Sequence, residues 1–239
     1  MELYMFQCGS IRTRKHLLAK VPEDNTPFEV PVPFFLIMHP DGNVLFITGQ
    51  PLSAVNSTAV GDYIPVMKEA EHISRQLAKV GLKTADITHI VLSHLHSDHA
   101  GGLEAFEDAV CYVQAGELLD DNGRRMMDQY PLPRRLVSGD HDLFGDGRIK
   151  MIFTPGHSPG HQSLLLRLER TGGILLAADS VYLDEILENC VMPGNVRDHE
   201  AMLKTLARIM EMRRNGIRVI SGHDPQSWAG FRLAPAYYE

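Results

Sequence analysis

The chain alternates between short apolar runs and stretches with a helical period. Residues 32–39 and 43–49 are apolar runs on either side of Pro40-Asp41-Gly42, where proline fixes φ and glycine tolerates a positive φ. Such a pair predicts a β-hairpin. Short runs rich in β-branched and aliphatic residues predict further strands over residues 87–93, 109–114, 148–156, 163–169, 173–180 and 217–224.

Two stretches have apolar residues at steps of three and four, which is the period of a helix. Residues 65–80 show this pattern and are followed by Gly81, so we predict an amphipathic helix there. A second helix is predicted over residues 198–215, with Asp198 as its N-cap and Gly216 after its end. The apolar face expected for this second helix consists of Leu203, Leu206, Ile209 and Met210.

The order of these elements indicates the fold class. Strands come first and then alternate with helices, which predicts two mixed sheets packed face to face with helices outside. Residues 115–147 have weak periodicity and many charges, so we expect them to leave the core and form part of a pocket rim. A linker is not evident, and 44% of the residues are apolar, enough for a proper core. We therefore predict a single domain over residues 1–239.

Side chains that bind metals follow four of the predicted strands, where a chain leaves a sheet. Four of them lie within six residues after the strand at 87–93. Such a cluster has little structural use, because buried imidazoles lose hydration and repel one another when protonated unless a cation organises them. The candidate ligands are His94, His96, Asp98, His99, His157, Asp179 and His223.

The spacing of these residues predicts two metal ions. His94 and His96 are two apart, so both can point to one side of an extended turn and hold one ion. Asp98 and His99 follow where the chain turns into a helix, and they can reach a second ion. A carboxylate such as Asp179 can bridge two cations, because each oxygen can face one of them. Imidazole and carboxylate suit Zn²⁺, with Mn²⁺, Fe²⁺ or Co²⁺ as substitutes, so we predict two Zn²⁺ per chain.

The remaining histidines and the cysteines are expected to be structural. His161, four residues after His157, is expected to be a hydrogen-bonded neighbour of the metal site. Cys8, Cys111 and Cys190 fit neither a disulfide framework nor a CxxC metal site, so we expect buried free thiols. The other histidines with a structural interpretation are His16, His39, His72, His89, His141 and His199.

Composition narrows the class of partner. The formal net charge of -7 repels phosphate backbones, so we expect no nucleic-acid partner. The first residues lack the apolar length of a signal peptide, and we find no window that approaches a membrane span. We therefore expect a cytoplasmic protein without a membrane partner. The oligomeric state stays open, a homodimer included.

Several motifs resemble those of the metallo-β-lactamase superfamily. They are HLHSDHAGG, TPGHSPGHQS, AADSVY and SGHD. Within that superfamily, the loop HSPGHQS and the closing segment HDPQSWAGFRLAP are similar to those of the N-acyl-homoserine lactonases, which are quorum-quenching enzymes. The likeness covers nearly the whole chain. It implies an αββα sandwich of two mixed β-sheets flanked by helices, with the metals at one end.

The resemblance also implies a role for each site residue. It assigns His94, His96 and His157 to one zinc, and Asp98, His99 and His223 to the other, with Asp179 bridging. It matches Tyr182 to the tyrosine that contacts the lactone carbonyl. The implied reaction is hydrolytic ring opening of a small-molecule N-acyl-homoserine lactone, in which a metal-bound hydroxide attacks the carbonyl. Asp98 and Tyr182 are then the catalytic residues, with Asp98 placed to pass a proton to the departing ring oxygen.

One position departs from the family pattern, and it keeps alternatives to the lactonase function open. Ile47 stands where many members have an aspartate that supports the metal loop. Loss of such a residue can weaken metal binding or turnover by about 10–100-fold. The alternatives are another γ-lactone hydrolase, a thioester hydrolase resembling glyoxalase II, and an inactive metal-binding sensor or scaffold. A nuclease or phosphodiesterase is disfavoured by the negative charge.

Overall fold

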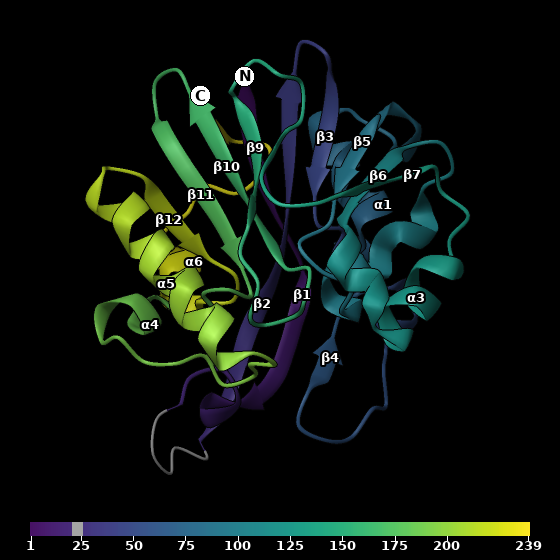
Figure 1. The fold of residues 1–239 in the computed structure, drawn as a ribbon. Helices are drawn as coiled ribbons and strands as arrows, with labels where there is room; N and C mark the ends of the chain where they lie inside the picture. The colour runs from purple at the N-terminus through teal and green to yellow at the C-terminus, as the bar shows by residue number, and fades with distance from the viewer. Residues whose placement is uncertain (21–25) are drawn as a thin grey trace.

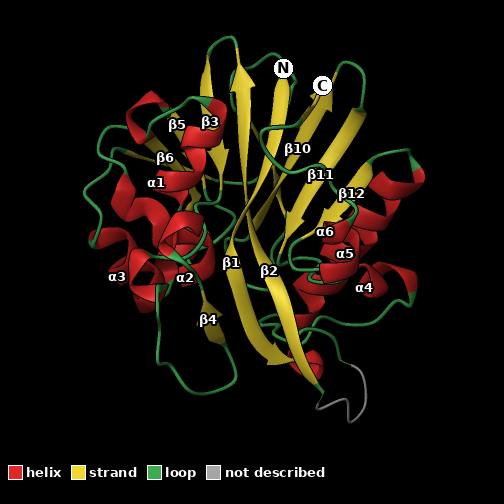
Figure 2. Ribbon diagram, turned by 180° about the vertical axis from the view of Figure 1, so that it is seen from behind, coloured by secondary structure: helices red, strands yellow, loops and turns green. Residues whose placement is uncertain are grey.

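The computed structural model describes residues 1–20 and 26–239. Within these residues, two β-sheets pack together and helices lie beside each of them (Figure 1). Seen from behind, one group of helices lies beside the first sheet and another beside the second (Figure 2). The predicted αββα sandwich of two mixed sheets is therefore confirmed. The helices are α1 (Ile73–Gln76), α2 (Ser97–Ala100), α3 (Asp121–Asp128), α4 (Asp184–Glu188), α5 (His199–Arg214) and α6 (Pro225–Ala229).

The first sheet combines antiparallel and parallel pairs. Its strand order is β13-β1-β2-β3-β5-β6-β7, with β4 paired to β1. The pairs from β1 to β3 are antiparallel, whereas β3, β5, β6 and β7 run parallel. These strands are β1 (Glu2–Arg14), β2 (Pro27–His39), β3 (Gly42–Phe46), β4 (Ile64–Val66), β5 (His89–Val91), β6 (Val110–Gln114), β7 (Arg134–Val137) and β13 (Tyr237–Tyr238).

The second sheet has the order β12-β11-β10-β9-β8. Its pairs are antiparallel except that between β11 and β12, which is parallel. The four strands predicted over residues 148–224 are present as β9 to β12; β10 has its predicted length but begins one residue earlier, and the other three are shorter than predicted. The short strand β8 at the edge of this sheet was not predicted. These strands are β8 (His141–Asp142), β9 (Ile149–Phe153), β10 (Gln162–Leu168), β11 (Gly172–Ala178) and β12 (Arg218–Ser221).

The prediction of a helix over residues 65–80 was wrong for the first residues of this range. Residues Ile64–Val66 form β4, which pairs with β1 from Arg12 to Ser10. The free edge of β1 offers backbone hydrogen bonds there, and this long-range pairing overrides the local period. The rest of the stretch is α1 between single 3₁₀ turns, and it ends as predicted at Gly81, with φ 75°.

The second predicted helix is present as α5, but its buried face is rotated. Asp198 caps it, because its carboxylate accepts a hydrogen bond from the Ala201 N–H at 3.0 Å. Leu203, expected in the core, is 58% exposed, while Met202 is fully buried. The hydroxyl of Thr205 donates to the Pro155 carbonyl at 2.7 Å, which fixes the helix with Met202 and Thr205 facing inward.

Residues 115–147 were predicted to leave the core, but they are part of it. They contain α3, in which Met127 is fully buried, and the edge strands β7 and β8 of both sheets. The long strand β1 was also not predicted, because residues 3–6 are buried throughout and show no alternation. A strand buried on both faces cannot be recognised by a two-residue period.

Two of the three cysteines are buried, as the sequence predicted. Cys8 and Cys111 are buried free thiols, as expected, but Cys190 is exposed. It follows the end of α4 with φ 53°, in a turn at the surface. In the part of the chain that the structure describes, no helix is long and apolar enough to cross a membrane.

Candidate metal centre

The structure brings all seven predicted ligands together from both sheets. His94 and His96 follow β5, Asp98 and His99 lie in α2, and the other three follow β9, β11 and β12. They form two groups, within each of which one possible ligand atom per residue lies within 4.8 Å of the others. We call them the three-histidine group (His94, His96, His157 and Asp179) and the Asp98 group (Asp98, His99 and His223).

The three-histidine group is arranged around a common point. The Nε2 atom of His157 lies 3.1 Å from Nε2 of His94 and 3.1 Å from Nδ1 of His96. The Oδ2 atom of Asp179 lies 3.6 Å from Nε2 of His94 and 3.5 Å from Nε2 of His157. One carboxylate oxygen and three ring nitrogens therefore face a single position, as in a tetrahedral zinc site.

The Asp98 group meets the same bridging aspartate on its other side. Nε2 of His99 lies 3.3 Å from Nε2 of His223 and 3.3 Å from Oδ2 of Asp98. The Oδ1 atom of Asp179 lies 3.0 Å from Nε2 of His99 and 3.2 Å from Nε2 of His223. The two oxygens of Asp179 thus face the two groups, one each, which is the geometry that a bridging carboxylate needs.

The hydrogen bonds of two rings, His157 and His223, indicate which of their nitrogens carries a lone pair. Nδ1 of His157 lies 3.0 Å from the Asn195 carbonyl, and Nδ1 of His223 lies 2.8 Å from the Pro31 carbonyl. A carbonyl oxygen accepts only, so Nδ1 carries the hydrogen and Nε2 of each neutral ring is unprotonated. Nε2 of His157 therefore meets His94 and His96 as an acceptor, which is the form in which an imidazole binds a metal ion. Ligating histidines are held in this way in many metal sites.

Asp179 gives an independent indication of a cation site. Among the residues that the structure describes, its buried Oδ1 has no hydrogen-bond partner of good geometry. The Nε2 atoms of His99 and His223 lie 3.0 and 3.2 Å from it without that alignment, and a metal ion held between them would satisfy the oxygen and both rings. The residues present therefore fit a dinuclear metal site.

The ionisation states also differ between the two groups. Burial, followed by the charges of neighbouring imidazoles, lowers the pKa of His94 well below its usual value. Burial lowers the pKa of His157 to about 4, so both rings are neutral and ready to bind metal near pH 7. Burial opposes the charge on Asp98, yet His99 and His223 outweigh it and lower the pKa of Asp98 to about 2. In the same way, Asp179 and Asp98 raise the pKa of His99 to about 10.

The protonated His99 has a chemical consequence. A metal ion binds the deprotonated ring nitrogen, so it must displace this proton as it enters the Asp98 group. The three-histidine group has no such proton on His94 or His157 near neutral pH. Metal uptake is therefore expected to release protons mainly at the Asp98 group.

Ile47 lies close to this centre and in an unusual conformation. It follows β3 with φ 58°, is 1% exposed, and its N–H donates to the Val91 carbonyl at 2.8 Å. The next residue, Thr48, donates its N–H to the His99 carbonyl at 2.7 Å and its hydroxyl to the same oxygen at 3.1 Å. The backbone of this loop therefore supports α2 although Ile47 has no carboxylate. A left-handed conformation costs a β-branched residue about 1–3 kcal/mol, and aspartate tolerates it better.

Tyr182 lies over the metal ligands at the floor of a cavity. Its hydroxyl oxygen is 2.9 Å from Nδ1 of His157, and the residue is 4% exposed. Burial, and then the charge of Asp179, raise the pKa of Tyr182 well above its usual value, so the phenol keeps its proton. The cavity has a volume of about 290 Å³. Its polar lining includes Tyr63, Gln50 and Asn195, which the sequence did not single out because they lie in loops without a motif.

The other histidines have partners that do not involve the two groups. Nδ1 of His161 lies 3.1 Å from the Thr154 carbonyl and 2.9 Å from the Thr154 hydroxyl. The ring centre of His161 is 5.3 Å from that of His94, so it is a buried, hydrogen-bonded neighbour of the site. His39 contacts Asp146 at 2.9 Å. These contacts agree with the structural role expected for both.

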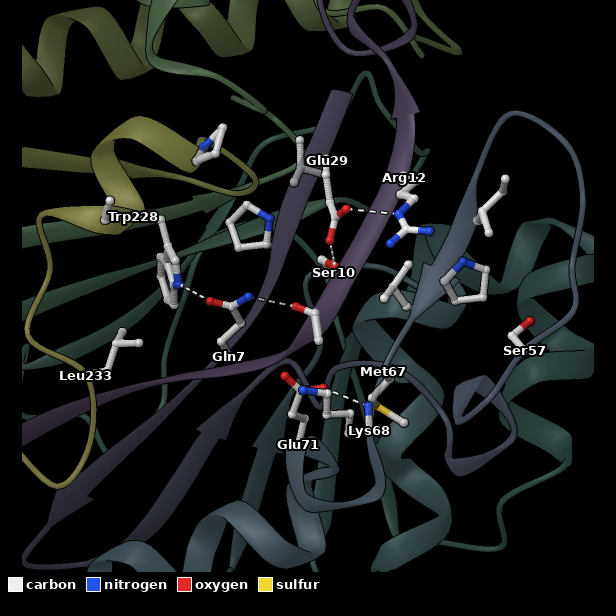
Figure 3. Close-up of a pocket in the computed structure, with 18 of the residues that line it drawn as sticks. Gln7, Ser10, Arg12, Glu29, Ser57, Met67, Lys68, Glu71, Trp228 and Leu233 are labelled. Atoms are coloured by element: carbon white, nitrogen blue, oxygen red, sulfur yellow. Dashed lines mark hydrogen bonds and ion pairs between the residues drawn. The ribbon is translucent and has the colours of Figure 1, made fainter. Parts of the chain in front are cut away.

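A second hollow lies along β1 and β2, on the side of α6 and β4 (Figure 3). Its volume of about 840 Å³ exceeds that of the metal cavity. Five of its polar side chains are joined by hydrogen bonds: Trp228 donates to Gln7 at 2.9 Å, and Glu29 accepts from Ser10 at 2.5 Å and from Arg12 at 3.0 Å. We call this hollow the outer groove. It contains none of the metal ligands among the described residues.

A comparison with known families agrees with the metal centre. Residues 29–223 match the model of a family described as the metallo-beta-lactamase superfamily. The chain belongs to the metallo-β-lactamase superfamily. The fold and the predicted membership are thereby confirmed, and the two ligand groups lie where strands of both sheets end.

Within the superfamily, the chain is similar over its full length to lactonases. It is 33% identical over 260 residues to the N-acyl homoserine lactonase AttM of Azorhizobium caulinodans, covering 100% of this chain and 99% of the relative. It is 35% identical over 249 residues to an N-acyl homoserine lactonase of Bacillus cereus, covering 99% and 98%.

A solved structure shows the same fold. It is an N-acyl homoserine lactone hydrolase with the product N-hexanoyl-L-homoserine bound at the catalytic metal centre. The TM-score is 0.90 at 30% identity, and the match covers 99% of this chain and 98% of the other. This member of the metallo-β-lactamase superfamily thus shares its fold with a lactone hydrolase that has a catalytic metal centre, and its own histidines and aspartates form two groups that fit a dinuclear metal site.

Proposed function

We propose that the protein is a di-zinc hydrolase that opens the lactone ring of N-acyl-homoserine lactones. The observation that carries the proposal is the placement of Asp179, whose two oxygens face the two ligand groups 3.5 Å or less from one imidazole of each. The full-length similarity to lactonases supports the substrate class. Imidazole and carboxylate ligands support zinc.

The two groups define where the chemistry takes place. When bound, the metal ions supply Lewis acidity and a water of lowered pKa as the nucleophile. His94, His96 and His157 would hold one ion and Asp98, His99 and His223 the other, with Asp179 between them. In the proposed reaction, the substrate carbonyl would lie in the cavity between these groups and Tyr182.

Tyr182 and Asp98 have the roles that the reaction requires of the protein. Nδ1 of His157 keeps its hydrogen on the Asn195 carbonyl and so offers the phenol no lone pair. The Tyr182 hydroxyl beside Asp179 can therefore turn to donate to a carbonyl in the cavity. This hydrogen bond strengthens as negative charge develops on the carbonyl oxygen. Asp98 lines the same cavity and can hold the proton that the departing ring oxygen needs.

The cavity walls fit a small acylated ring. The volume of about 290 Å³ is small for a ligand pocket, which suits a lactone ring and a short chain rather than a large substrate. Apolar side chains also line the cavity and can contact the acyl group. They are Ile11, Leu18, Val30 and Pro65.

The test measures metal content and hydrolysis on one preparation. N-hexanoyl-homoserine lactone, γ-butyrolactone, S-lactoylglutathione and bis-p-nitrophenyl phosphate are compared by kcat/KM, with acid release as the readout. The proposal expects about two zinc ions per chain and the highest kcat/KM for the acylated lactone. A higher value for the thioester would identify a glyoxalase II-like enzyme. Two bound metals without turnover of any substrate would identify an inactive homologue.

A further inference from the structure

A buried carboxylate outside both ligand groups connects the loops that carry the three histidines. Glu117 lies in the 3₁₀ turn Ala115–Leu119 and is 5% exposed. We propose that Glu117 is a positioning residue that sets the metal affinity of the three-histidine group, and that it does not serve the Asp98 group. The inference rests on the metal binding in the proposed function, and it does not depend on the substrate.

The carboxylate of Glu117 accepts hydrogen bonds from two separate loops. Its Oε2 accepts from the Leu95 N–H at 3.1 Å, and Leu95 lies between His94 and His96. Its Oε1 accepts from the Gly160 N–H at 2.8 Å and from the Ser158 hydroxyl at 2.5 Å. Ser158 directly follows His157. One side chain therefore fixes both loops that supply the histidines of this group.

The two loops are far apart along the chain, so the distance between them in the folded protein is set by tertiary contacts. His94 and His157 are 63 positions apart, and their Nε2 atoms must stay at 3.1 Å for one ion to hold both. Ligating atoms need to be held within about 0.5 Å of their working geometry. A shift of one loop against the other would move a ring nitrogen away from the shared ion.

The segment that carries Glu117 packs closely against the loop that follows His157, with no space between the two backbones for an added side chain. A Cβ atom at Gly160 would lie 2.4 Å from the Glu117 nitrogen, and one at Gly116 would lie 2.8 Å from the Pro159 carbonyl oxygen. The backbones of the two segments therefore touch directly. A replacement side chain at position 117 has to use the same space.

The chemistry of the three partners requires a carboxylate. Two backbone N–H groups and one hydroxyl all donate, and a carboxylate offers acceptors on both oxygens. A glutamine in the same place would present an NH₂ group to at least one N–H. The Leu95 N–H would then lose its acceptor inside the protein, which is unfavourable for a buried donor. Glu117→Gln is thus a small change in shape and a specific change in hydrogen bonding.

The Asp98 group has a different support. Its His99 is held through the Thr48 N–H and hydroxyl, and its His223 through the Pro31 carbonyl. Glu117 contacts none of these residues in the hydrogen bonds found for the described chain. A residue that served only general stability would affect both metals to a similar extent, and this difference makes the proposal testable.

The experiment measures the zinc dissociation constant by chelator competition in two single-site backgrounds. His99→Ala removes a ligand of the Asp98 group and leaves the three-histidine group, whereas His96→Ala does the reverse. We expect Glu117→Gln to weaken zinc binding about tenfold or more in the His99→Ala background. In the His96→Ala background we expect a change of no more than about twofold.

Controls separate positioning from general loss of stability. Val44→Ala removes two methyl groups from a fully buried position in β3 and serves as the matched control for lowered Tm. It should affect both backgrounds equally. If Glu117→Gln fails to fold, Ser158→Ala removes one of the three hydrogen bonds and should shift affinity in the same direction by less.

Two results would overturn the proposal. One is an equal loss of affinity in both backgrounds, as in the control, and the other is no loss in either. Both measurements of zinc affinity are made without substrate. A wild-type chain that binds two zinc ions and hydrolyses no lactone would therefore contradict the proposed function, but the role of Glu117 could still be measured. In the wild-type background, added zinc should restore kcat of Glu117→Gln with KM unchanged.

Discussion

The metal cavity and the outer groove differ in how their polar atoms are satisfied. The groove is the larger, at about 840 Å³ against about 290 Å³, yet Gln7, Glu29 and their partners in it are joined by side-chain hydrogen bonds. In the metal cavity, Nε2 of His157 faces Nε2 of His94 at 3.1 Å, and Oδ1 of Asp179 makes no hydrogen bond of good geometry among the described residues. Unsatisfied acceptors, rather than volume, therefore identify the place where this chain binds a cation.

The sharpest way to break this comparison is to change the bridging residue. Asp179→Asn keeps the shape of the side chain but removes the charge that holds two cations. We expect kcat to fall by about 100-fold or more, since loss of even a supporting residue can cost about 10–100-fold. Lactone hydrolysis and zinc content are measured on the same sample. Retention of both metals with near-normal turnover would show that Asp179 is not the bridge.

Tyr182→Phe tests the cavity without changing a proposed ligand. Removal of one hydroxyl takes away a hydrogen bond to the developing oxyanion, and a lost donor of this kind costs about 10²–10³ in rate where it acts alone. A metal ion shares the task here, so we expect a decrease of about tenfold in kcat and unchanged zinc content. Steady-state kinetics with elemental analysis decides. Unchanged kcat and KM would mean that the ring only packs.

Ile47→Asp sharpens the comparison at the edge of the metal cavity. The left-handed backbone at φ 58° suits aspartate better than isoleucine, and the new carboxylate would lie in the loop that supports His99. We expect zinc retention against a chelator to rise by less than about tenfold. Ile47→Gly relieves the backbone without adding a carboxylate and is the matched control. Weaker retention in a stably folded Ile47→Asp variant would contradict this account, because a buried, unpaired carboxylate destabilises.

The smallest effect is expected in the outer groove. Hydrogen bonds from Ser10 and then Arg12 lower the pKa of the Glu29 carboxyl group. A group with a lowered pKa in the folded chain stabilises the fold above its unfolded pKa, and this contribution is lost as the pH falls. Glu29→Gln should therefore lower Tm at pH 7 by no more than about 4 °C, because a partly exposed pair contributes about 1 kcal/mol or less.

The same variant carries its own control in the pH series. The difference in Tm between Glu29→Gln and the wild type should shrink toward pH 3, and kcat and zinc content should stay unchanged. A loss of zinc in Glu29→Gln would show that the groove and the metal cavity are coupled, and the contrast between the two hollows would fail.

The metal ligands could be predicted from the sequence because each follows an apolar run. His157, Asp179 and His223 each come directly after a strand of one sheet, and strand ends gather at sheet edges. The type of each residue then indicates the chemistry without knowledge of the contacts. The spacing separated His94 and His96 from Asp98 and His99, whereas the assignment of His157 and His223 depended on the family resemblance. The distances around Asp179 agree with both assignments.

The features that were missed depend on contacts between distant segments. Residues 64–66 have a helical period, but the edge of β1 pairs with them as a strand. Leu203 and Met202 are neighbours in one helix, and the packing against the chain around Pro155 decides which one is buried. Glu117 stands in a charged stretch, where a single glutamate gives no signal until Leu95 and Ser158 are seen to donate to it.

Because the ligands come from both sheets, the metal centre is complete only when the whole chain has folded. His99 and His223 are 124 positions apart, and their Nε2 atoms come within 3.3 Å only when both halves are folded and docked. The first half supplies His94 to His99, and the second supplies His157, Asp179 and His223, so each half has an incomplete ligand set. A chain divided between β7 and β8 would therefore regain tight dinuclear binding only on reassociation, and metal occupancy would report directly on whether the two fragments had found each other.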